Sequence, residues 1–291
     1  MKYLENTKLV ILVSLILSIF FQDIATFLKD YLIYVLIFML TISIKKVGDV
    51  KLKKEKRDFV TELVVLNLFV LGGLYILFSY LFIGNDLYRD AMIIFGLMPP
   101  AAGIVSLGYL YNVDMKVDLY AEFIAYALSL ITIPLGSFLF LNDVISPMEI
   151  VEVIFLILII PFILSRGVSK LDVSDSVLKS LVNLSIGVIV FTIVGFNLEE
   201  MIMNFSDIIS IIFILIVLRL VMIVVLFLWS RKYFDESKTM LITLFGSLKN
   251  GSAATAIALL TLGVESTPPL AIEVIFFSLA ILLLDWLHET F

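Results

Sequence analysis

Long uninterrupted runs of apolar residues constrain this chain more than any other feature of its sequence. One of them extends from Ile211 to Trp229 and contains a single charged residue, Arg219. A run of this length crosses the hydrocarbon core of a bilayer as a helix, whereas membrane β-barrels use alternating segments of about ten residues. Hydrophobic residues make up 62% of the chain and charged residues 16%, against about half and a quarter in soluble domains. The sequence therefore predicts an all-α integral membrane protein.

Polar breaks between the apolar runs divide the chain into ten predicted spans. The first run, Leu9–Phe21, is followed by Gln22 and Asp23 rather than by a small-residue cleavage site. We therefore expect it to be retained as a span and not removed as a signal peptide. The ten predicted spans are residues 8–22, 31–44, 59–83, 91–111, 119–141, 150–165, 178–196, 206–229, 239–263 and 268–287.

Lysine and arginine are distributed unequally between the loops. The even-numbered loops hold seven, one, three and three of them, fourteen in all, and the odd-numbered loops hold only Lys29 and Arg89. Cytoplasmic loops of membrane proteins are enriched in these residues. We therefore expect a multi-pass protein of the cell (plasma or inner) membrane with both termini in the cytoplasm. The basic loop 45–58 is expected to be cytoplasmic and to set this topology.

The two halves of the chain resemble each other. Spans three, four and five begin 147 to 149 residues before spans eight, nine and ten, and Phe95-Gly96 recurs as Phe245-Gly246, 150 residues later. Five spans is an odd number, so a duplicated second half enters the membrane with the opposite orientation. The sequence thus predicts two inverted five-helix repeats, residues 1–145 and 146–291, as in many secondary transporters.

Spans four and nine are both interrupted near their middles. Pro99-Pro100 removes two backbone donors in span four, and Asn250-Gly251 is a turn signal in span nine. Either break alone also fits an ordinary packing kink or a small-residue contact. Half-helices starting near Ala101 and Ser252 would direct N–H groups to the midplane as an anion site, and the preceding carbonyls would suit a cation. The predicted substrate site comprises Pro99, Pro100, Ala101, Ala102, Gly103, Lys249, Asn250, Gly251 and Ser252.

Charged residues inside the spans are candidates for function. Lys249 lies near mid-membrane, where a lysine costs at least about 2.5 kcal/mol. Its alternative role is structural, as a salt bridge to Glu273 or Glu122. For Arg219 we expect an interhelical pair or snorkelling toward the cytoplasm, and for Glu122 a position at the interface. The predicted ion-coupling residues are Lys249, Asn250, Glu122 and Glu273.

Several classes of function are excluded by composition. The chain has no cysteine, and its only histidine, His288, lies near the C-terminus. Thiol catalysis, histidine metal clusters and a Ser-His triad are therefore not expected, and a sensor would need a soluble output domain. We expect no enzyme, no metal site, no cofactor other than Na⁺ or H⁺ as a coupling ion, and no nucleic-acid partner.

Three segments resemble the bile acid:sodium symporter family. Met98–Asp114, followed by Leu128–Pro134, resembles that family's fourth and fifth helices, and Phe245–Ala258 resembles its ninth. The Pro-Pro-Ala-Ala stretch resembles the auxin efflux carrier family equally. The resemblance implies panel and core domains, helices four and nine crossing at the midplane, elevator-like alternating access and an organic-anion substrate such as a bile acid or carboxylate.

The chain departs from the sodium-coupled pattern at the positions that matter for sodium. It has Ile104-Val105 where the symporters carry Ser-Asn, Phe245 where they carry glutamate, and Lys249 where they carry glutamine, while Asn250 is retained. We therefore expect a secondary transporter of a small organic anion that does not depend on sodium. Coupling to protons through Lys249 or a glutamate, or uncoupled movement, remains open. The alternatives are an auxin-efflux-type carrier and a cation/proton antiporter that uses Lys249.

Overall fold

The computed structural model describes residues 3–44, 54–101, 103–141, 152–153, 155–168 and 173–290. Within these ranges the regular structure is entirely helical, without a β-strand. Ala102, most of the basic loop 45–58 and the predicted boundary between the halves at 145/146 lie outside the described residues.

Six helical stretches of the described chain are long and apolar enough to cross a membrane. Large apolar side chains such as Ile131, Phe138 and Ile202 are exposed on the outer surfaces of these stretches, as expected where lipid is the solvent. The prediction of a helical multi-pass membrane protein is therefore confirmed. The six stretches are Gln22–Ser43, Lys54–Phe82, Met115–Phe140, Ser176–Met203, Phe205–Ser230 and Pro268–Thr290.

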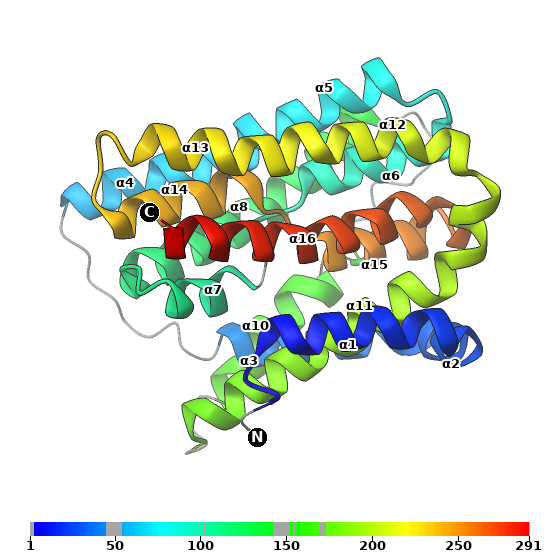
Figure 1. The fold of residues 1–291 in the computed structure, drawn as a ribbon, viewed down its shortest axis with the longest axis horizontal. Helices are drawn as coiled ribbons and strands as arrows, with labels where there is room; N and C mark the ends of the chain where they lie inside the picture. The colour runs from blue at the N-terminus through cyan, green and yellow to red at the C-terminus, as the bar shows by residue number, and fades with distance from the viewer. Residues whose placement is uncertain are drawn as a thin grey trace.

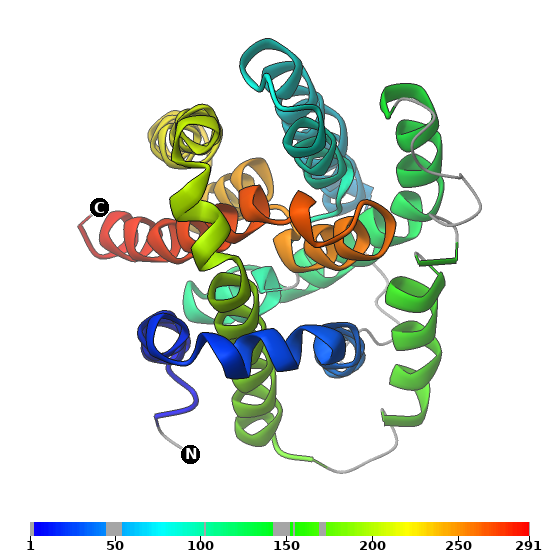
Figure 2. The same ribbon diagram turned by 90° about the vertical axis from the view of Figure 1, so that its right-hand side faces the viewer.

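One group of helices lies in the lower part of Figure 1. In it α1 packs on α11, and α3 packs on both α10 and α11. Figure 2 shows that α2 runs across the ends of α1 and α3, so residues 22–43 do not form one straight span. The prediction of spans at 8–22 and 31–44 missed this connecting helix. The group comprises α1 (Thr7–Phe20), α2 (Gln22–Leu28), α3 (Leu32–Ile44), α10 (Ile160–Val168) and α11 (Asp175–Met203).

The second group lies above the first in Figure 1, and α16 packs against α11 where the groups meet. Its innermost helices are α6, buried from Asp90 to Leu97, and α14, buried from Thr239 to Ser247. The group comprises α4 (Lys54–Val65), α5 (Gly72–Phe82), α6 (Asp86–Leu97), α7 (Ile104–Leu110), α8 (Met115–Phe140), α12 (Phe205–Leu215), α13 (Met222–Ser230), α14 (Glu236–Ser247), α15 (Gly251–Thr261) and α16 (Pro268–Thr290).

Several features of this group recur 150 residues apart. Helices α6 and α14 have twelve residues each, and their starts differ by 150 positions. Each is capped by a side-chain oxygen at the corresponding position, Asn85 and Asp235. Single π-helical turns join α4 to α5 at Leu66–Leu71 and α12 to α13 at Ile216–Val221. The spacing agrees with the offset of Phe95-Gly96 and Phe245-Gly246 in the sequence.

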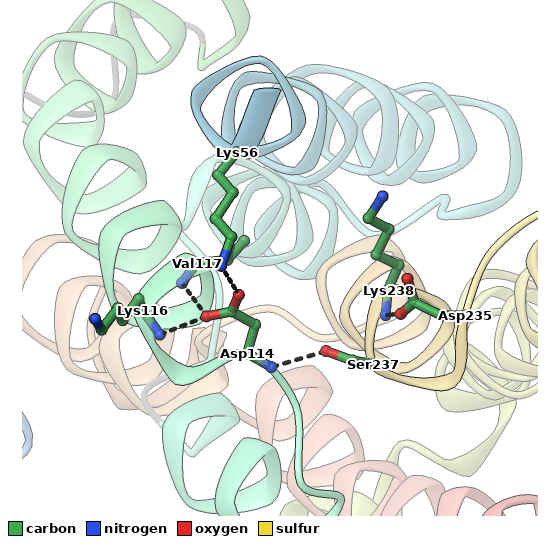
Figure 3. Close-up of polar contacts among 7 residues, drawn as sticks. All are labelled: Lys56, Asp114, Lys116, Val117, Asp235, Ser237 and Lys238. Atoms are coloured by element: carbon green, nitrogen blue, oxygen red, sulfur yellow. Dashed lines mark hydrogen bonds and ion pairs between the residues drawn. The ribbon is translucent and has the colours of Figure 1, made fainter. Parts of the chain in front are cut away.

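Polar contacts tie the loops together at one end of the helices. The Asp114 carboxylate, at the start of α8, pairs with Lys56 of α4, and the Asp114 N–H donates to the Ser237 hydroxyl at 2.8 Å (Figure 3). Near them Lys8, close to the N-terminus, pairs with Asp285, close to the C-terminus. Three even-numbered loops and both terminal segments therefore share one end.

A close backbone contact joins α5 to α6 and offers a matched pair of substitutions. A Cβ on Gly72 would lie 2.6 Å from the Gly96 carbonyl oxygen, whereas a Cβ on Gly73 would meet nothing within 4 Å. Gly72→Ala should therefore destabilise the protein by about 1–3 kcal/mol through overpacking. Gly73→Ala should be neutral or stabilise it by up to about 1 kcal/mol. Thermal unfolding of both variants in detergent tests this, and equal melting temperatures would contradict the close contact.

Candidate functional site

The two predicted helix interruptions are present and lie side by side. The backbone becomes extended at Met98, after α6, and again at Leu248, after α14. The two extended segments form an antiparallel bridge between Pro100 and Lys249. The Asn250 N–H donates to the Pro99 carbonyl at 3.0 Å. Some backbone groups that lack a helical hydrogen-bond partner at one break thus bond to backbone groups at the other break.

The starts of the two half-helices differ from the prediction. The N-cap of α15 is Asn250, whose side-chain oxygen accepts from the Ala253 N–H at 2.9 Å, and not Ser252. Asparagine is as good a cap as serine, so the earlier residue takes the position. Helix α7 begins at Ile104 and not at Ala101, because the Ala101 carbonyl accepts from the Ile104 N–H in a turn.

Lys249 is fully buried, and its ammonium donates to the Met98 carbonyl. Met98 is the C-cap of α6, and a cation is stabilised at the C-terminal end of a helix. No carboxylate of the described residues pairs with this ammonium. The alternative role of Lys249, a salt bridge to Glu273 or Glu122, is therefore not formed. The reason is geometric, since the lysine side chain extends toward Gly72 and the end of α6.

Glu273 pairs instead with Arg219. The Arg219 Nη2 lies 2.5 Å from the Glu273 Oε1, and both side chains are buried. The Glu273 carboxylate lies in close contact with the first residue of α15, since a Cβ on Gly251 would lie 1.7 Å from the Glu273 Oε2. The N-terminal end of α15, which favours negative charge, thus already faces an internal carboxylate.

Arg219 lies in the π-helical turn between α12 and α13. Its guanidinium lies over the rings of Phe95 and Phe277, 5.7 and 5.8 Å from their centroids, within the range of cation–π attraction. The interhelical pair expected for Arg219 is present, whereas the π-helical turn that carries it was not foreseen. Such turns are frequent at functional sites.

Glu122 is buried against neighbouring helices, and its predicted position at the membrane interface stays a prediction. Only 9% of its surface is exposed, and Asp118, one turn earlier on α8, is completely buried. Helix α8 begins at Met115 and packs on α4, α6 and α7. That packing covers the face that carries both acids.

Two polar residues at the crossing were missed by the sequence analysis. The Asn67 amide donates to the carbonyls of Phe245 and Leu248, at 2.7 and 3.0 Å, and so caps the end of α14. The Tyr126 hydroxyl accepts from the Asn250 amide at 2.7 Å and lies 3.3 Å from the Pro100 carbonyl, to which it donates. Asn67 interrupts an apolar run and was detectable by the rule applied to Lys249. Nothing in the sequence singles out Tyr126.

A pocket of about 40 Å³ lies beside the crossing, between the two groups of helices. It brings together most of the predicted site, although Pro99 and Pro100 do not line it and Ala102 is outside the described residues. The volume admits a few water molecules at most, against about 300–1,000 Å³ for sites that hold organic ligands. The structure is therefore closed around the site. The lining residues are Met39, Ala101, Gly103, Ile186, Val190, Lys249, Asn250, Gly251, Ser252, Glu273, Val274 and Phe277.

Basic side chains outnumber acidic ones at this site. Lys249 and Arg219 are two buried basic side chains, and among the described residues Glu273 is the one carboxylate that pairs with either. Within the described residues no group of three His, Cys, Asp or Glu side chains is arranged to hold a metal ion. The arrangement is therefore suited to a small anion with hydrogen-bond acceptors.

No protein-family model matches this chain, and no curated protein is detectably similar to it. The function of the site is therefore inferred from its own geometry and charge.

Proposed function

We propose that this protein is a secondary active transporter that moves a small organic anion across the cell membrane by alternating access. The observation that carries the proposal is the Lys249 ammonium, buried where two broken helices meet and without a carboxylate partner among the described residues. Buried ionisable residues inside a membrane are costly and mark substrate or ion pathways. The pocket beside Lys249 also lies between the two groups of helices, and alternating access requires these groups to move relative to each other.

The architecture we propose is ten spans in two inverted five-helix halves, residues 1–145 and 146–291. The 150-residue offset of α6 and α14, of their caps and of the two π-helical turns supports a duplication. Discontinuous helices meeting at a repeat interface are typical of secondary transporters. The first group of helices corresponds to the panel and the second to the core that the resemblance to bile acid:sodium symporters implies.

The substrate we propose is a small anion, because the buried cluster holds two basic side chains and one carboxylate, which leaves one positive charge uncompensated when Lys249 is protonated. An uncompensated buried charge is strongly unfavourable, and a bound carboxylate would neutralise it. The side chains of Asn250 and Ser252 line the same pocket and offer neutral hydrogen-bond donors. Since the pocket is smaller than an organic anion, the substrate must enter after the two groups of helices separate.

The orientation we propose has both termini in the cytoplasm, and the contacts between loops support it. Lys8, Lys56 and Ser237 lie at the same end of the helices as the C-terminal segment, and this end collects the even-numbered, lysine-rich loops. Arg89 follows Asn85, which contacts Asp207 at the opposite end. By the positive-inside rule the first end, with both termini, faces the cytoplasm.

A cation/proton antiporter is the second candidate, favoured by the bond from the Lys249 ammonium to the Met98 carbonyl. In an antiporter of this kind the Lys249 ammonium would compete with the transported cation for the Met98 carbonyl at the end of α6. The two candidates differ in the sign of the ligand that the site binds.

A thermal-shift screen of the purified protein distinguishes the two candidates. Organic carboxylates and sulfonates should raise the melting temperature, since a ligand at about 100 times its Kd adds about 2.7 kcal/mol to the folded state. The neutral amide of the same compound is the matched control and should have no effect. Stabilisation by monovalent cations alone, with none by any organic anion, would favour the antiporter and contradict our proposal.

Sodium should not be required for transport of any anion identified in this way. The Lys249 ammonium already occupies the C-terminal end of α6, and Ile104, Val105 and Phe245 supply no side-chain oxygen. Uptake into proteoliposomes should therefore be unchanged when choline replaces sodium. A steep and saturable sodium requirement would refute this prediction.

A further inference from the structure

Four polar side chains follow one another along α8 at intervals of four residues: Asp114, Asp118, Glu122 and Tyr126. Side chains four residues apart lie one above the other on a helix, with about 5–6 Å between their Cβ atoms. The row begins at the exposed end of α8 and ends at the crossing of the broken helices. It therefore joins the solvent to the candidate site.

The outer end of the row is in contact with water. The side chain of Asp114 is 32% exposed and pairs with Lys56, as Figure 3 shows. Partial burial alone would raise the pKa of this carboxyl, but the bond and charge of Lys56, with the N–H groups of Val117 and Lys116, outweigh burial and hold the pKa below its ordinary value. Asp114 is therefore ionised at neutral pH and open to exchange with solvent.

The middle of the row is buried and lacks a cation. Neither carboxyl oxygen of Asp118 has a hydrogen-bond partner among the described residues, and Glu122 lies one turn away. Two carboxylates this close in an apolar environment cannot both be ionised. At least one of them therefore holds a proton.

The charged groups on the neighbouring elements do not neutralise this pair. Lys56 is engaged with Asp114, and the Tyr111 hydroxyl, beyond the end of α7, is bonded to Asp285. The largely buried charged side chains of α6, Arg89 and Asp90, lie near the opposite end of the molecule from Asp118. The remaining charged residues of α4 and α8 near the pair are exposed, namely Lys54, Glu55, Arg57, Asp58, Glu62 and Lys116.

The inner end of the row touches both broken segments. The Tyr126 hydroxyl accepts from Asn250, which caps α15, and donates to the Pro100 carbonyl in the segment between α6 and α7. Tyr126 is therefore the one described side chain that bonds to both segments through its own hydroxyl.

From this geometry we propose that Asp118 and Glu122 bind the coupling proton of the transporter and that Tyr126 transmits their protonation to the crossing. The inference rests on the proposed function and names its coupling ion. In this step one O–H bond of a hydronium ion breaks, one O–H bond forms at a carboxylate oxygen, and a water molecule is released. While Glu122 is neutral, the Tyr126 hydroxyl donates to Pro100. When Glu122 is ionised, the hydroxyl turns to the carboxylate, and the Pro100 carbonyl loses its donor.

Infrared difference spectroscopy of the purified protein tests the proton-binding pair without any substrate. The spectrum of the wild type minus that of the Asp118→Asn/Glu122→Gln variant should contain, at neutral pH, the carbonyl band of a protonated carboxyl that shifts in D₂O. Glu62→Gln, on the exposed face of α4, is the matched control and should leave that band in place. Absence of the band from the wild-type minus double-variant difference would overturn the proposal.

Transmission to the crossing is tested with a single cysteine at Ser252, in a chain that has none of its own. The labelling rate of this cysteine is divided by its rate in the Asp118→Asn/Glu122→Gln background, which corrects for the ionisation of the thiol. This ratio should change by up to about tenfold per pH unit within the range of about pH 5 to 9. Tyr126→Phe should abolish this change and keep the infrared band. The same pH profile in all three backgrounds would contradict transmission through Tyr126.

These outcomes are separate from those that decide the proposed function. Neither measurement uses an organic anion, so a failed anion screen leaves the proton-binding pair intact. Conversely, a protein that binds anions but lacks the carboxyl band is a transporter whose coupling ion is not bound by this pair.

Discussion

Replacing Arg219 with glutamine should destabilise the protein by about 3–5 kcal/mol, because the Glu273 carboxylate would remain buried without its cation. The guanidinium also covers the rings of Phe95 and Phe277, so the substitution removes packing together with charge. Glu273→Gln should have an effect of similar size for the converse reason. Denaturant titration or thermal unfolding in detergent measures both.

The double variant Arg219→Gln/Glu273→Gln separates the ion pair from packing. Removal of both charges leaves no uncompensated ion, so the double variant should be markedly more stable than the sum of the single effects predicts. Arg57→Gln, on the exposed face of α4, is the control and should change stability by less than about 0.5 kcal/mol. If Arg219→Gln changes stability as little as Arg57→Gln does, the Arg219–Glu273 pair does not stabilise the packing of α16 against the π-helical turn.

Replacing Lys249 with glutamine should weaken the binding of an organic anion by at least tenfold in Kd, about 1.4 kcal/mol. The substitution removes the unbalanced positive charge of the site. It retains an N–H donor for the Met98 carbonyl that accepts from the lysine, so the protein should still fold and insert. Isothermal titration with an anion found in the thermal-shift screen measures the change.

Lys249→Arg is the matched comparison for this prediction. It keeps the charge but should restore binding only in part, because a planar guanidinium does not fit the space of an ammonium beside Gly72. If Lys249→Gln leaves anion affinity unchanged and lowers stability as much as Arg219→Gln does, Lys249 is a structural residue and not a binding one.

The sequence predicted the positions of the helices and of their breaks because both depend on local chemistry. Apolar length placed span eight at 206–229, where the structure has Phe205–Ser230. Pro99-Pro100 and Asn250-Gly251 marked the two interruptions to within a few residues. Helix α2 was missed because its sequence, Gln22–Leu28, mixes polar and apolar residues without a helix start signal of its own.

The partners of the charged residues could not be predicted in the same way. Lys249 lies in the extended segment between α14 and α15, whereas Arg219 and Glu273 lie on two different helices. Which of the three side chains meet depends on how these elements pack against one another. The π-helical turn at Ile216–Val221 turns Arg219 toward α16, and no residue in that turn signals it. For the same reason the sequence did not show that the packing of α4, α6 and α7 on α8 buries Glu122.

Alternating access is tested most directly by the sidedness of labelling at the crossing. Single cysteines replace Ser252, Gly84 or Lys232 in sealed vesicles of one orientation, and a membrane-impermeant thiol reagent is added to either side. Gly84 and Lys232 are exposed in loops at opposite ends of the helices, so each should react from one side only. A cysteine at Ser252, which lines the pocket, should react from both sides. Labelling of Ser252Cys from one side alone, under every pH and anion tested, would contradict a transporter that exposes this site alternately to the two faces of the membrane.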